Sequence, residues 1–413
     1  MYLLLVYCLV VAPVFSETLK NYKDYKHYEV QGSREGLEHL KNLLLQRDEF
    51  LIHSDSRNSS EIILSPHLAS ALEAIATEEN LRVKLLHRDV SEIIQSEKVP
   101  HRRFNKFSWD AYYDVDDIHK YIYDTSKSFG EWTEIIEAGE SYEGRKILGL
   151  RINTRYEKGQ RETGKPVFFI ESGIHAREWI APAVTTYFIN QLLTSRDPNV
   201  TRLRDQFDWR IFPTVNPDGY HYSYTVDRYW RKTRSRSLNG CRGADPNRNW
   251  DYNWGQHSSS TKPCDYQLYA GSRPFSEVET RSLSKYISTI DNLLFYVAFH
   301  SYASVLLVPY SDSFEHVDNY DELVQIGRKS IEYGSRINSD LYDGPDTAAA
   351  TLYKASGGSM DWVRHALGTR LVYTYELRGS SFHWPAERIS EQGDEVTLMM
   401  MGLADGAQEL GYF

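Results

Sequence analysis

The sequence lacks an excess of positive charge. Its 413 residues include 47 Lys and Arg against 57 Asp and Glu, which gives a formal net charge of -10. Nucleic-acid-binding proteins gather basic residues into a patch, whereas only short basic clusters interrupt this acidic chain, so we expect no nucleic-acid partner. Hydrophobic residues make up 41% of the chain and charged residues 25%, the composition of an ordinary globular protein.

The sequence also lacks a hydrophobic run long enough to cross a membrane, for which a helix needs about 20 apolar residues. The N-terminal run from Leu3 to Val11 is shorter than this. Pro13 follows the run, and Ser16 stands where a signal peptidase would cut. We interpret residues 1–16 as a secretory signal peptide, although no Lys or Arg precedes the run. The protein is therefore expected to be secreted and extracellular, without a membrane partner.

Cysteine is scarce as well. Of the three cysteines, Cys8 would leave with the signal peptide, so that Cys241 and Cys264 remain. Two thiols in an oxidising compartment predict one disulfide bond, which closes a loop of about 24 residues and stabilises the fold by about 3 kcal/mol in the chain-entropy model. The alternative, a zinc site with two cysteine ligands, would need histidines nearby, and only His257 is close.

The length allows two domains, and the sequence pattern changes near residue 104. Residues 17–103 alternate short strands with short amphipathic helices. Leucines recur there at helical spacing, as at Leu37, Leu40 and Leu44. A second helix is expected to open with Ser65 as N-cap and Pro66 at its first position. We predict a small α+β domain with helices on one side of an antiparallel sheet.

The larger unit, residues 104–413, is predicted to be an α/β domain with a mixed, mostly parallel sheet flanked by helices. The candidate core strands are residues 165–170, 209–215, 293–299 and 371–374. Most of them are nearly continuous apolar runs, which is typical of strands buried on both faces. Each strand is followed by a polar motif, and ligands of open α/β sheets bind outside the carboxyl ends of the strands.

The two predicted domains are joined by the segment from Glu97 to Phe104, which is polar, basic and interrupted by Pro100. We interpret it as an exposed linker, the kind of segment at which proteases cut. A trypsin-like protease would cut after Arg102 or Arg103. The residues alone also allow a plain interdomain hinge.

The most informative stretch contains His175 and Glu178, which follow a hydrophobic strand. An imidazole and a carboxylate three residues apart can bind one zinc ion, and together with a distant histidine they leave one position open for water. By itself this spacing is weak, because polar residues three positions apart often form a surface pair. The motifs further along the chain determine whether this pair is interpreted as part of a metal site.

Five polar motifs follow in order. They are Asn216 to Gly219, Tyr229 to Arg234, Asp245 to Trp250, His300 to Tyr302 and Tyr375 to Arg378. In sequence and spacing, this set resembles the zinc carboxypeptidases of the digestive A/B type, which are made as secreted proenzymes. The resemblance covers nearly the whole chain. It implies that residues 17–103 are an activation pro-domain and linker, which cover the active site until a protease cuts after Arg102 or Arg103.

The resemblance further implies one zinc ion per chain, bound by His175, Glu178 and His300. It makes Asp245 the acceptor for the far ring nitrogen of His175, which fixes the tautomer of the ring. Glu376 would take a proton from the water that the metal activates and pass it to the leaving amine, which is worth about 10²- to 10⁴-fold in rate. From the residues alone, a salt bridge from Glu376 to Arg378 or to another cation is the alternative explanation.

The same resemblance assigns Arg231 to the carbonyl oxygen that becomes anionic, where the loss of one donor costs about 10²- to 10³-fold. The residues expected to bind the substrate are Arg177, Asn247, Arg248, Ser301, Tyr302, Tyr353 and Met360. Arg248 would form a bidentate pair with the C-terminal carboxylate of the substrate, and Tyr353 would close over it. Such a carboxylate clamp makes an exopeptidase, because an endopeptidase would have no use for it.

The resemblance also identifies the wall of the pocket for the C-terminal side chain. The wall comprises Leu307, Ser311, Ala348, Leu352, Ala355, Ser359, Met360 and Thr374. Relatives that remove Lys and Arg carry an acid where this chain has Met360. A buried cation would find no partner in this pocket, so we predict an A-type preference for aromatic or aliphatic C-terminal residues. Asp361 is adjacent, but it belongs to the family's common framework and does not reverse the prediction.

Three other functions stay open at this point. A catalytically inactive homologue acting as a binding protein would lack a ligand, the base or the clamp, and none is missing. A related zinc hydrolase of N-acyl amino acids or amidated peptides would not need the carboxylate clamp. A prohormone-processing relative would generally lack a domain such as residues 17–103. The expected partners are therefore peptide or protein C-termini and a trypsin-like activating protease, with a monomer as the default.

Overall fold

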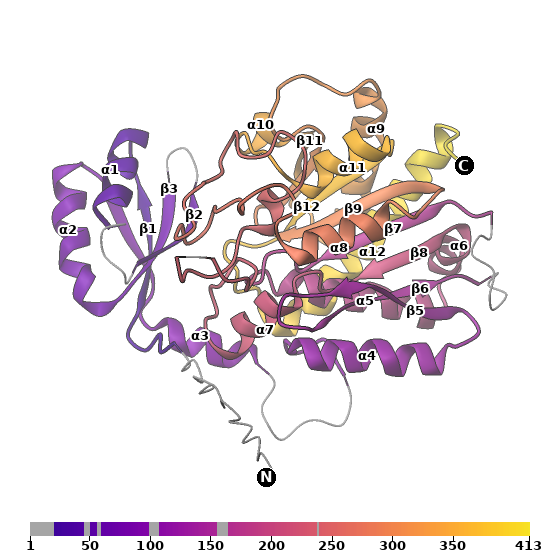
Figure 1. The fold of residues 1–413 in the computed structure, drawn as a ribbon, viewed down its shortest axis with the longest axis horizontal. Helices are drawn as coiled ribbons and strands as arrows, with labels where there is room; N and C mark the ends of the chain where they lie inside the picture. The colour runs from indigo at the N-terminus through magenta and orange to yellow at the C-terminus, as the bar shows by residue number, and fades with distance from the viewer. Residues whose placement is uncertain (1–19, 45–49, 56–58, 99–106, 155–163, 238) are drawn as a thin grey trace, which may run out of the picture.

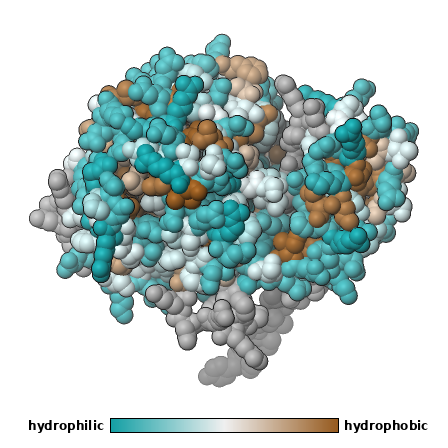
Figure 2. All heavy atoms as spheres, turned by 180° about the vertical axis from the view of Figure 1, so that it is seen from behind, coloured by the Kyte–Doolittle hydropathy of each residue, from teal (hydrophilic) through white to brown (hydrophobic). Residues whose placement is uncertain are grey.

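The computed structural model describes residues 20–44, 50–55, 59–98, 107–154, 164–237 and 239–413, which form a small N-terminal domain and a large C-terminal domain (Figure 1). The predicted signal peptide and the two predicted cleavage residues, Arg102 and Arg103, lie outside the described residues. Within the described ranges, no helix has the length and apolar character that a membrane span requires. Figure 2, seen from behind, shows a mostly hydrophilic surface with hydrophobic side chains gathered in small groups.

The N-terminal domain is a four-stranded antiparallel sheet in the order β2-β3-β1-β4. Its elements are β1 (Lys26–Gln31), α1 (Arg34–Leu44), β2 (Phe50–Asp55), β3 (Ser59–Leu64), α2 (Ala69–Glu78), β4 (Arg82–His87) and α3 (Val90–Glu97). Helices α1 and α2 cover the outer face of the sheet, on the left in Figure 1, where Leu40 and Leu72 pack against Val30. This confirms the predicted α+β architecture. The second helix differs in one detail, because a 3₁₀ turn, η1 (Pro66–Leu68), precedes α2 and Ser65 caps that turn without a side-chain hydrogen bond.

The C-terminal domain is built on an eight-stranded sheet in the order β11-β10-β12-β9-β7-β8-β6-β5. The strands are β5 (Thr133–Glu140), β6 (Lys146–Ile152), β7 (Val167–Ser172), β8 (Asp208–Phe212), β9 (Leu293–Ser301), β10 (Val305–Val308), β11 (Asp343–Thr347) and β12 (Leu371–Leu377). The central strands β12, β9, β7 and β8 run parallel, and antiparallel strands join them on both sides. The predicted mixed, mostly parallel sheet is confirmed.

Helices cover both faces of this sheet, so alternate residues of each central strand enter two different cores. Phe168 and Val297 belong to the core under helices α4 (Val115–Ser128), α5 (Ile180–Thr194), α6 (Pro198–Gln206), α9 (Tyr320–Gly334) and α12 (Ile389–Glu409). Phe169 and Tyr296 belong to the core under α8 (Val278–Ile287) and α11 (Ser359–Leu367). The near-continuous apolar runs of the sequence follow from this burial on both faces.

Four shorter elements and one disulfide bond complete the described part of the large domain. They are α7 (Pro217–Thr225), α10 (Ala348–Thr351), the 3₁₀ turns η2 (Pro246–Arg248) and η3 (Ala386–Arg388), and the predicted bond between Cys241 and Cys264, which the structure contains. The linker differs from its prediction at its first residue. Glu97 is only 3% exposed, because it ends α3 inside the contact between the two domains instead of in solvent.

Candidate metal centre and active site

His175 and Glu178 lie in the turn that leaves β7 and enters α5. The turn is made possible by Gly173, whose φ of 67° is left-handed and whose added Cβ would lie 3.1 Å from the carbonyl oxygen of Pro213. His300 lies near the end of β9, which pairs in parallel with β7. The carboxyl ends of two neighbouring parallel strands therefore bring these three side chains to one edge of the sheet.

The three side chains are buried and converge on one point. His175 Nδ1 lies 2.8 Å from Glu178 Oε1 and 3.1 Å from His300 Nδ1, which lies 3.2 Å from Glu178 Oε2. In the described part of the chain, they form the group whose ligand atoms all lie within 4.8 Å of one another. Two ring nitrogens and a carboxylate that face each other are best balanced by a shared cation. Zn²⁺ takes these ligands, and three of them leave a fourth position open, so the residues fit a catalytic zinc ion.

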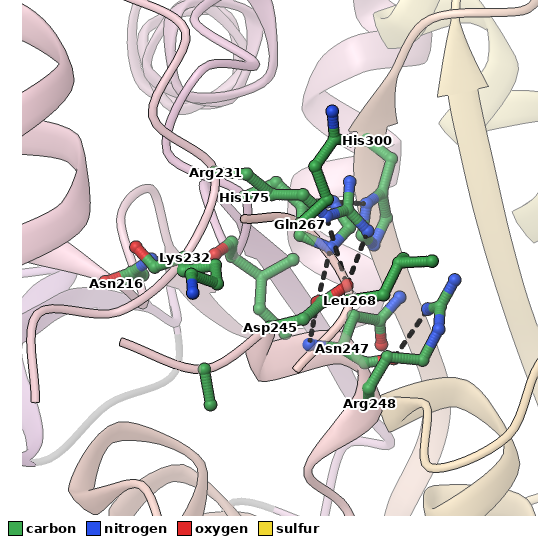
Figure 3. Close-up of polar contacts among 12 residues, drawn as sticks. His175, Asn216, Arg231, Lys232, Asp245, Asn247, Arg248, Gln267, Leu268 and His300 are labelled. Carbon is green, nitrogen blue, oxygen red and sulfur yellow. Dashed lines mark hydrogen bonds and ion pairs between the residues drawn. The ribbon is translucent and has the colours of Figure 1, made fainter. Parts of the chain in front are cut away.

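Asp245 connects these residues to a cation of the chain itself. Its Oδ1 lies 3.2 Å from His175 Nε2, and its Oδ2 accepts hydrogen bonds from Nε and Nη2 of Arg231 at 3.0 and 2.9 Å (Figure 3). Burial opposes the charge of Asp245, but Arg231 and His175 hold the pKa of its carboxyl well below the usual range. The carboxylate therefore favours a proton on Nε2 of His175, which leaves Nδ1 for the metal. Nη1 of Arg231 lies 3.8 Å from Glu178 Oε1, beside the metal centre.

Glu376 lies on β12, where the parallel register pairs it with His300 on β9. Burial raises the pKa of Glu376 to about 7; the His300 ring opposes this rise and the Glu178 carboxylate adds to it. A carboxyl group with a pKa near neutrality is suited to accept and then return a proton at physiological pH. The salt bridge that could have explained Glu376 is not made by Arg378, because Arg378 pairs with Glu395.

The predicted carboxylate clamp gathers at the end of η2. Arg248 is buried, and its Nε and Nη1 donate to the carbonyl oxygens of Ser258 and Asn247, each at 2.8 Å. Its Nη2 lies 3.4 Å from the hydroxyl of Tyr353, a side chain that is 48% exposed. Asn247 Oδ1 accepts the Ser359 N–H at 3.0 Å, which orients the amide so that its nitrogen is the donor for a ligand. The three predicted clamp residues thus lie together, with Tyr353 on the solvent side.

Arg177 is held by two residues that the sequence did not single out. Its Nη2 donates to Gln267 Oε1 at 3.1 Å, and its guanidinium lies 4.4 Å from the ring centroid of Phe382. Burial and the neighbouring Arg231 lower the pKa of Arg177 to about 10, so that it stays charged at neutral pH. Neither Gln267 nor Phe382 stands in a polar motif, and no sequence signal links them to a residue so distant along the chain.

Ser301 and Tyr302 follow His300 directly in the sequence. The backbone N–H of Ser301 donates to Glu178 Oε2 at 3.2 Å. The Tyr302 ring packs edge-on against Phe382, with 5.0 Å between the centroids. Tyr302 thus contacts the same ring that lies against Arg177, while Ser301 contacts Glu178.

Two adjacent residues at the start of α11 have different surroundings. Met360 is buried among apolar residues, and Thr374 Oγ1 lies 3.4 Å from its sulfur. Asp361 accepts hydrogen bonds from the Ser311 N–H, at 3.1 and 3.0 Å, and from the Ser311 hydroxyl at 3.2 Å. Burial raises the pKa of the Asp361 carboxyl to about 7. The nearest acid to Met360 in sequence is therefore engaged by Ser311.

Arg228 is a further residue that sequence reasoning left without a role. Its guanidinium binds Glu97 through Nε at 2.8 Å and Nη2 at 3.0 Å, and its Nη1 donates to the Arg177 carbonyl oxygen at 2.7 Å. It also lies 3.7 Å from the ring centroid of Trp179. Its partner Glu97 lies in another domain, and no local sequence pattern could identify it.

Comparisons with known proteins agree with this arrangement. The family model described as zinc carboxypeptidase matches residues 118–399. The chain is 33% identical to "Zinc carboxypeptidase A 1" of Anopheles gambiae, over 98% of this chain and 94% of the relative, and 35% identical to "Carboxypeptidase B" of Astacus astacus, over 70% and 94%. The crystal structure of the carboxypeptidase A from Helicoverpa armigera superposes with a TM-score of 0.81 at 26% identity, over 95% of this chain and 99% of that one.

Proposed function

The chain belongs to the zinc carboxypeptidase family and is a zinc metallocarboxypeptidase, and on this premise we propose that it is the secreted zymogen of an A-type enzyme. The mature enzyme would remove aromatic or aliphatic residues from the C-termini of peptides and proteins. Its zinc ion would be bound by His175, Glu178 and His300, whose ligand atoms converge at one edge of the sheet.

The residues around the metal have complementary roles in peptide hydrolysis. Zinc, when bound, lowers the pKa of a water molecule to about 7 and polarises the carbonyl to be attacked. Glu376 takes the proton of the attacking water and passes it to the leaving amine, for which a pKa near 7 is suited. Arg231 donates from Nη1 to the carbonyl oxygen as its negative charge develops, while Asp245 fixes the other side of the guanidinium.

The clamp restricts the enzyme to the last residue of a peptide. Arg248, with Asn247 beside it, binds the terminal carboxylate, and the exposed Tyr353 closes over the substrate. Arg177, Ser301 and Tyr302 contact the substrate on the other side of the scissile bond. Because Arg248 is already fixed by two carbonyl oxygens, little side-chain entropy is lost when the substrate binds.

The preference for apolar C-terminal residues is supported above all by the position of Asp361. Its carboxyl is engaged by Ser311, and Met360 is the side chain that faces Thr374. A Lys or Arg side chain in this pocket would be desolvated without a counter-ion. The similarity to a protein named carboxypeptidase B makes this the point that most needs an experiment.

The zymogen proposal is supported by the N-terminal domain, which docks on the large domain through buried polar contacts. Tyr22 donates to Asp227, and Glu97 pairs with Arg228. A trypsin-like protease would release the domain by cutting after Arg102 or Arg103, outside the described residues. The disulfide bond between Cys241 and Cys264 agrees with secretion. We take the active form to be a monomer.

Two blocked dipeptides test the proposal, one ending in Phe and the other in Arg, each assayed before and after limited trypsin treatment and with or without a zinc chelator. We expect release of Phe after trypsin treatment, and inhibition by the chelator. Release of Arg would contradict the predicted preference for apolar C-terminal residues, but it would still support the proposed metal centre. No release of either residue from folded, zinc-loaded protein would favour a binding protein without activity.

A substitution in the pocket sharpens this test. In the Met360→Asp variant, an acid would face the pocket, so we expect preference to shift from Phe toward Arg. Met360→Leu is the matched control, because it keeps an apolar side chain of similar volume and should keep the preference for Phe. An unchanged preference in Met360→Asp would show that this position does not line the pocket.

A further inference from the structure

The contact between the two domains contains a buried polar cluster outside the active site. We call it the interface cluster and define it as Glu97, Arg228, Tyr229 and His383. Glu97 ends α3 of the N-terminal domain, whereas the other three residues belong to the large domain. The side chains of Glu97 and His383 are 4% and 5% exposed, so water is almost excluded from both.

His383 lies between the two domains and is bonded on both ring nitrogens. Its Nδ1 is 2.9 Å from Glu97 Oε1, and its Nε2 is 2.6 Å from the Tyr229 hydroxyl. Glu97 is already bound by Arg228 through two nitrogens. Burial would raise the pKa of Glu97, but Arg228 and His383 lower it to about 2, so its single negative charge is matched by Arg228.

A second positive charge would therefore be poorly balanced in the interface cluster. Burial disfavours a charged His383, Glu97 favours it, and Arg228 and His27 oppose it, with a net lowering of its pKa. His27, on β1, is paired with Glu61 on β3 and stacks on His87 of β4 with 5.6 Å between the ring centroids. The strands of the N-terminal domain thus present two more imidazoles, and one acid that His27 already binds.

From this geometry we propose that the interface cluster is an acid-sensitive latch, in which protonation of His383 weakens the hold of the N-terminal domain on the large domain. The inference rests on the proposed zymogen function, in which the N-terminal domain must leave after the linker is cut. Release would then depend on two events, cleavage of the linker and a fall in pH. Burial, His27 and His383 also lower the pKa of His87, but His87 is exposed in the docked state. We assign the switch to His383 because its side chain is only 5% exposed between the two domains.

The sign of the effect follows from the two states of His383. In the docked state its pKa is lowered; once the domain leaves, the ring reaches water and its pKa moves toward the usual value of about 6.5. Docking is therefore strongest above about pH 6.5 and weakens as the pH falls below that value, where the released form binds a proton that the docked form does not. Each unit of pKa difference corresponds to about a tenfold change in the docking equilibrium.

The test uses the full-length protein, cut with trypsin at about pH 8 and then diluted into buffers between about pH 5 and 8. The N-terminal fragment that stays bound is measured by gel filtration, a readout that needs no peptidase activity. We expect the dissociation constant to rise several-fold toward the acid end, because the docked form takes up a proton less readily than the released form. A dissociation constant that is the same at all pH values would overturn the latch.

Two variants separate His383 from other buried histidines. His383→Gln keeps a donor and an acceptor but cannot take up a proton, so the fragment should leave to the same extent at each pH. His119→Gln is the matched control: burial also lowers the pKa of His119, but it lies on α4 and faces Asp116, Arg145 and Asp114 of the large domain. A full pH dependence retained in His383→Gln would contradict the proposal.

The failure of the zymogen proposal would be visible separately, as a linker that trypsin does not cut. The latch is then tested on the uncut chain by hydrogen exchange over residues 90–98, corrected for the intrinsic effect of pH. We expect protection in this segment to fall below about pH 6.5 in the wild type and to be independent of pH in His383→Gln. Unchanged protection in the wild type would rule the latch out.

Discussion

The metal centre and the interface cluster are two buried groups of charged residues that meet at one turn, the turn between β7 and α5. In the metal centre, His175, Glu178 and His300 face one another with their ligand atoms, and the nearest cation is bonded to Asp245. In the interface cluster, Glu97 has a bidentate arginine partner and a histidine. The first group needs an ion from outside to balance it, whereas the second is balanced by the docking of another domain.

The comparison shows that one buried group of charged residues can remain available to a ligand, while another is satisfied by contacts within the protein. Buried polar groups cost free energy when they are unmatched and rigidify a protein when they are satisfied. The two groups are also in contact, because Arg228 donates to the carbonyl oxygen of Arg177, which lies between the proposed ligands His175 and Glu178 in the sequence. Its guanidinium further packs on Trp179. Arg228 of the interface cluster thus holds the turn that carries two of the proposed metal ligands.

Removal of zinc should have the largest effect, and should affect only one of the two groups. A chelator is expected to abolish peptide hydrolysis, because no residue of the chain replaces a Lewis acid at the metal centre. The N-terminal domain of the uncut protein should stay docked, as measured by hydrogen exchange over residues 90–98. Added zinc should restore activity, and persistence of activity in metal-free protein would refute the role of the metal centre.

The Glu376→Gln substitution should have the second-largest effect. The substitution keeps the volume of the side chain but removes its ability to accept a proton, so kcat should fall about 10²- to 10⁴-fold. Zinc content, measured by atomic absorption, should not change. Glu137→Gln, on the edge strand β5, is the control and should keep full activity. A fall of less than tenfold for Glu376→Gln would mean that another group is the base.

Glu97→Gln breaks the interface cluster without touching the metal centre. It leaves Arg228 buried without an anion, and breaking a buried pair costs about 3–5 kcal/mol. We expect the cut fragment to leave much more readily at about pH 8, while the released enzyme keeps its kcat because Glu97 precedes the cleavage residues. Glu92→Gln, at an exposed position of the same helix, should have no effect. Docking as tight as in the wild type would contradict the importance of this ion pair.

Tyr229→Phe should have the smallest effect. The substitution preserves the ring and removes one hydrogen bond to His383 Nε2, which lies within the large domain and orients His383 toward Glu97. Docking at about pH 8 should therefore weaken by less than about 1 kcal/mol. The ratio of the dissociation constants of variant and wild type measures this loss. A loss as large as that of Glu97→Gln would mean that the hydroxyl supports more of the interface cluster than this single bond.

Some local features of the site could be predicted because their causes are local. The apolar runs that became β7, β9 and β12 are long enough to identify buried strands, and the polar residues at their ends had to meet at one edge of a parallel sheet. The disulfide bond followed from two remaining thiols. In contrast, Glu97 was interpreted as part of an exposed linker, because its neighbours in sequence are polar and basic.

The sequence by itself determined the family, the fold class and the candidate residues for the metal and the clamp, since these are carried by residue type and spacing. Only the tertiary structure decided which charges are matched. Arg228 meets Glu97 across 131 positions of the chain, and His383 meets Glu97 across 286. A residue's neighbours along the chain do not reveal such contacts, because a buried charge is stabilised by whichever partner the fold brings within hydrogen-bonding distance.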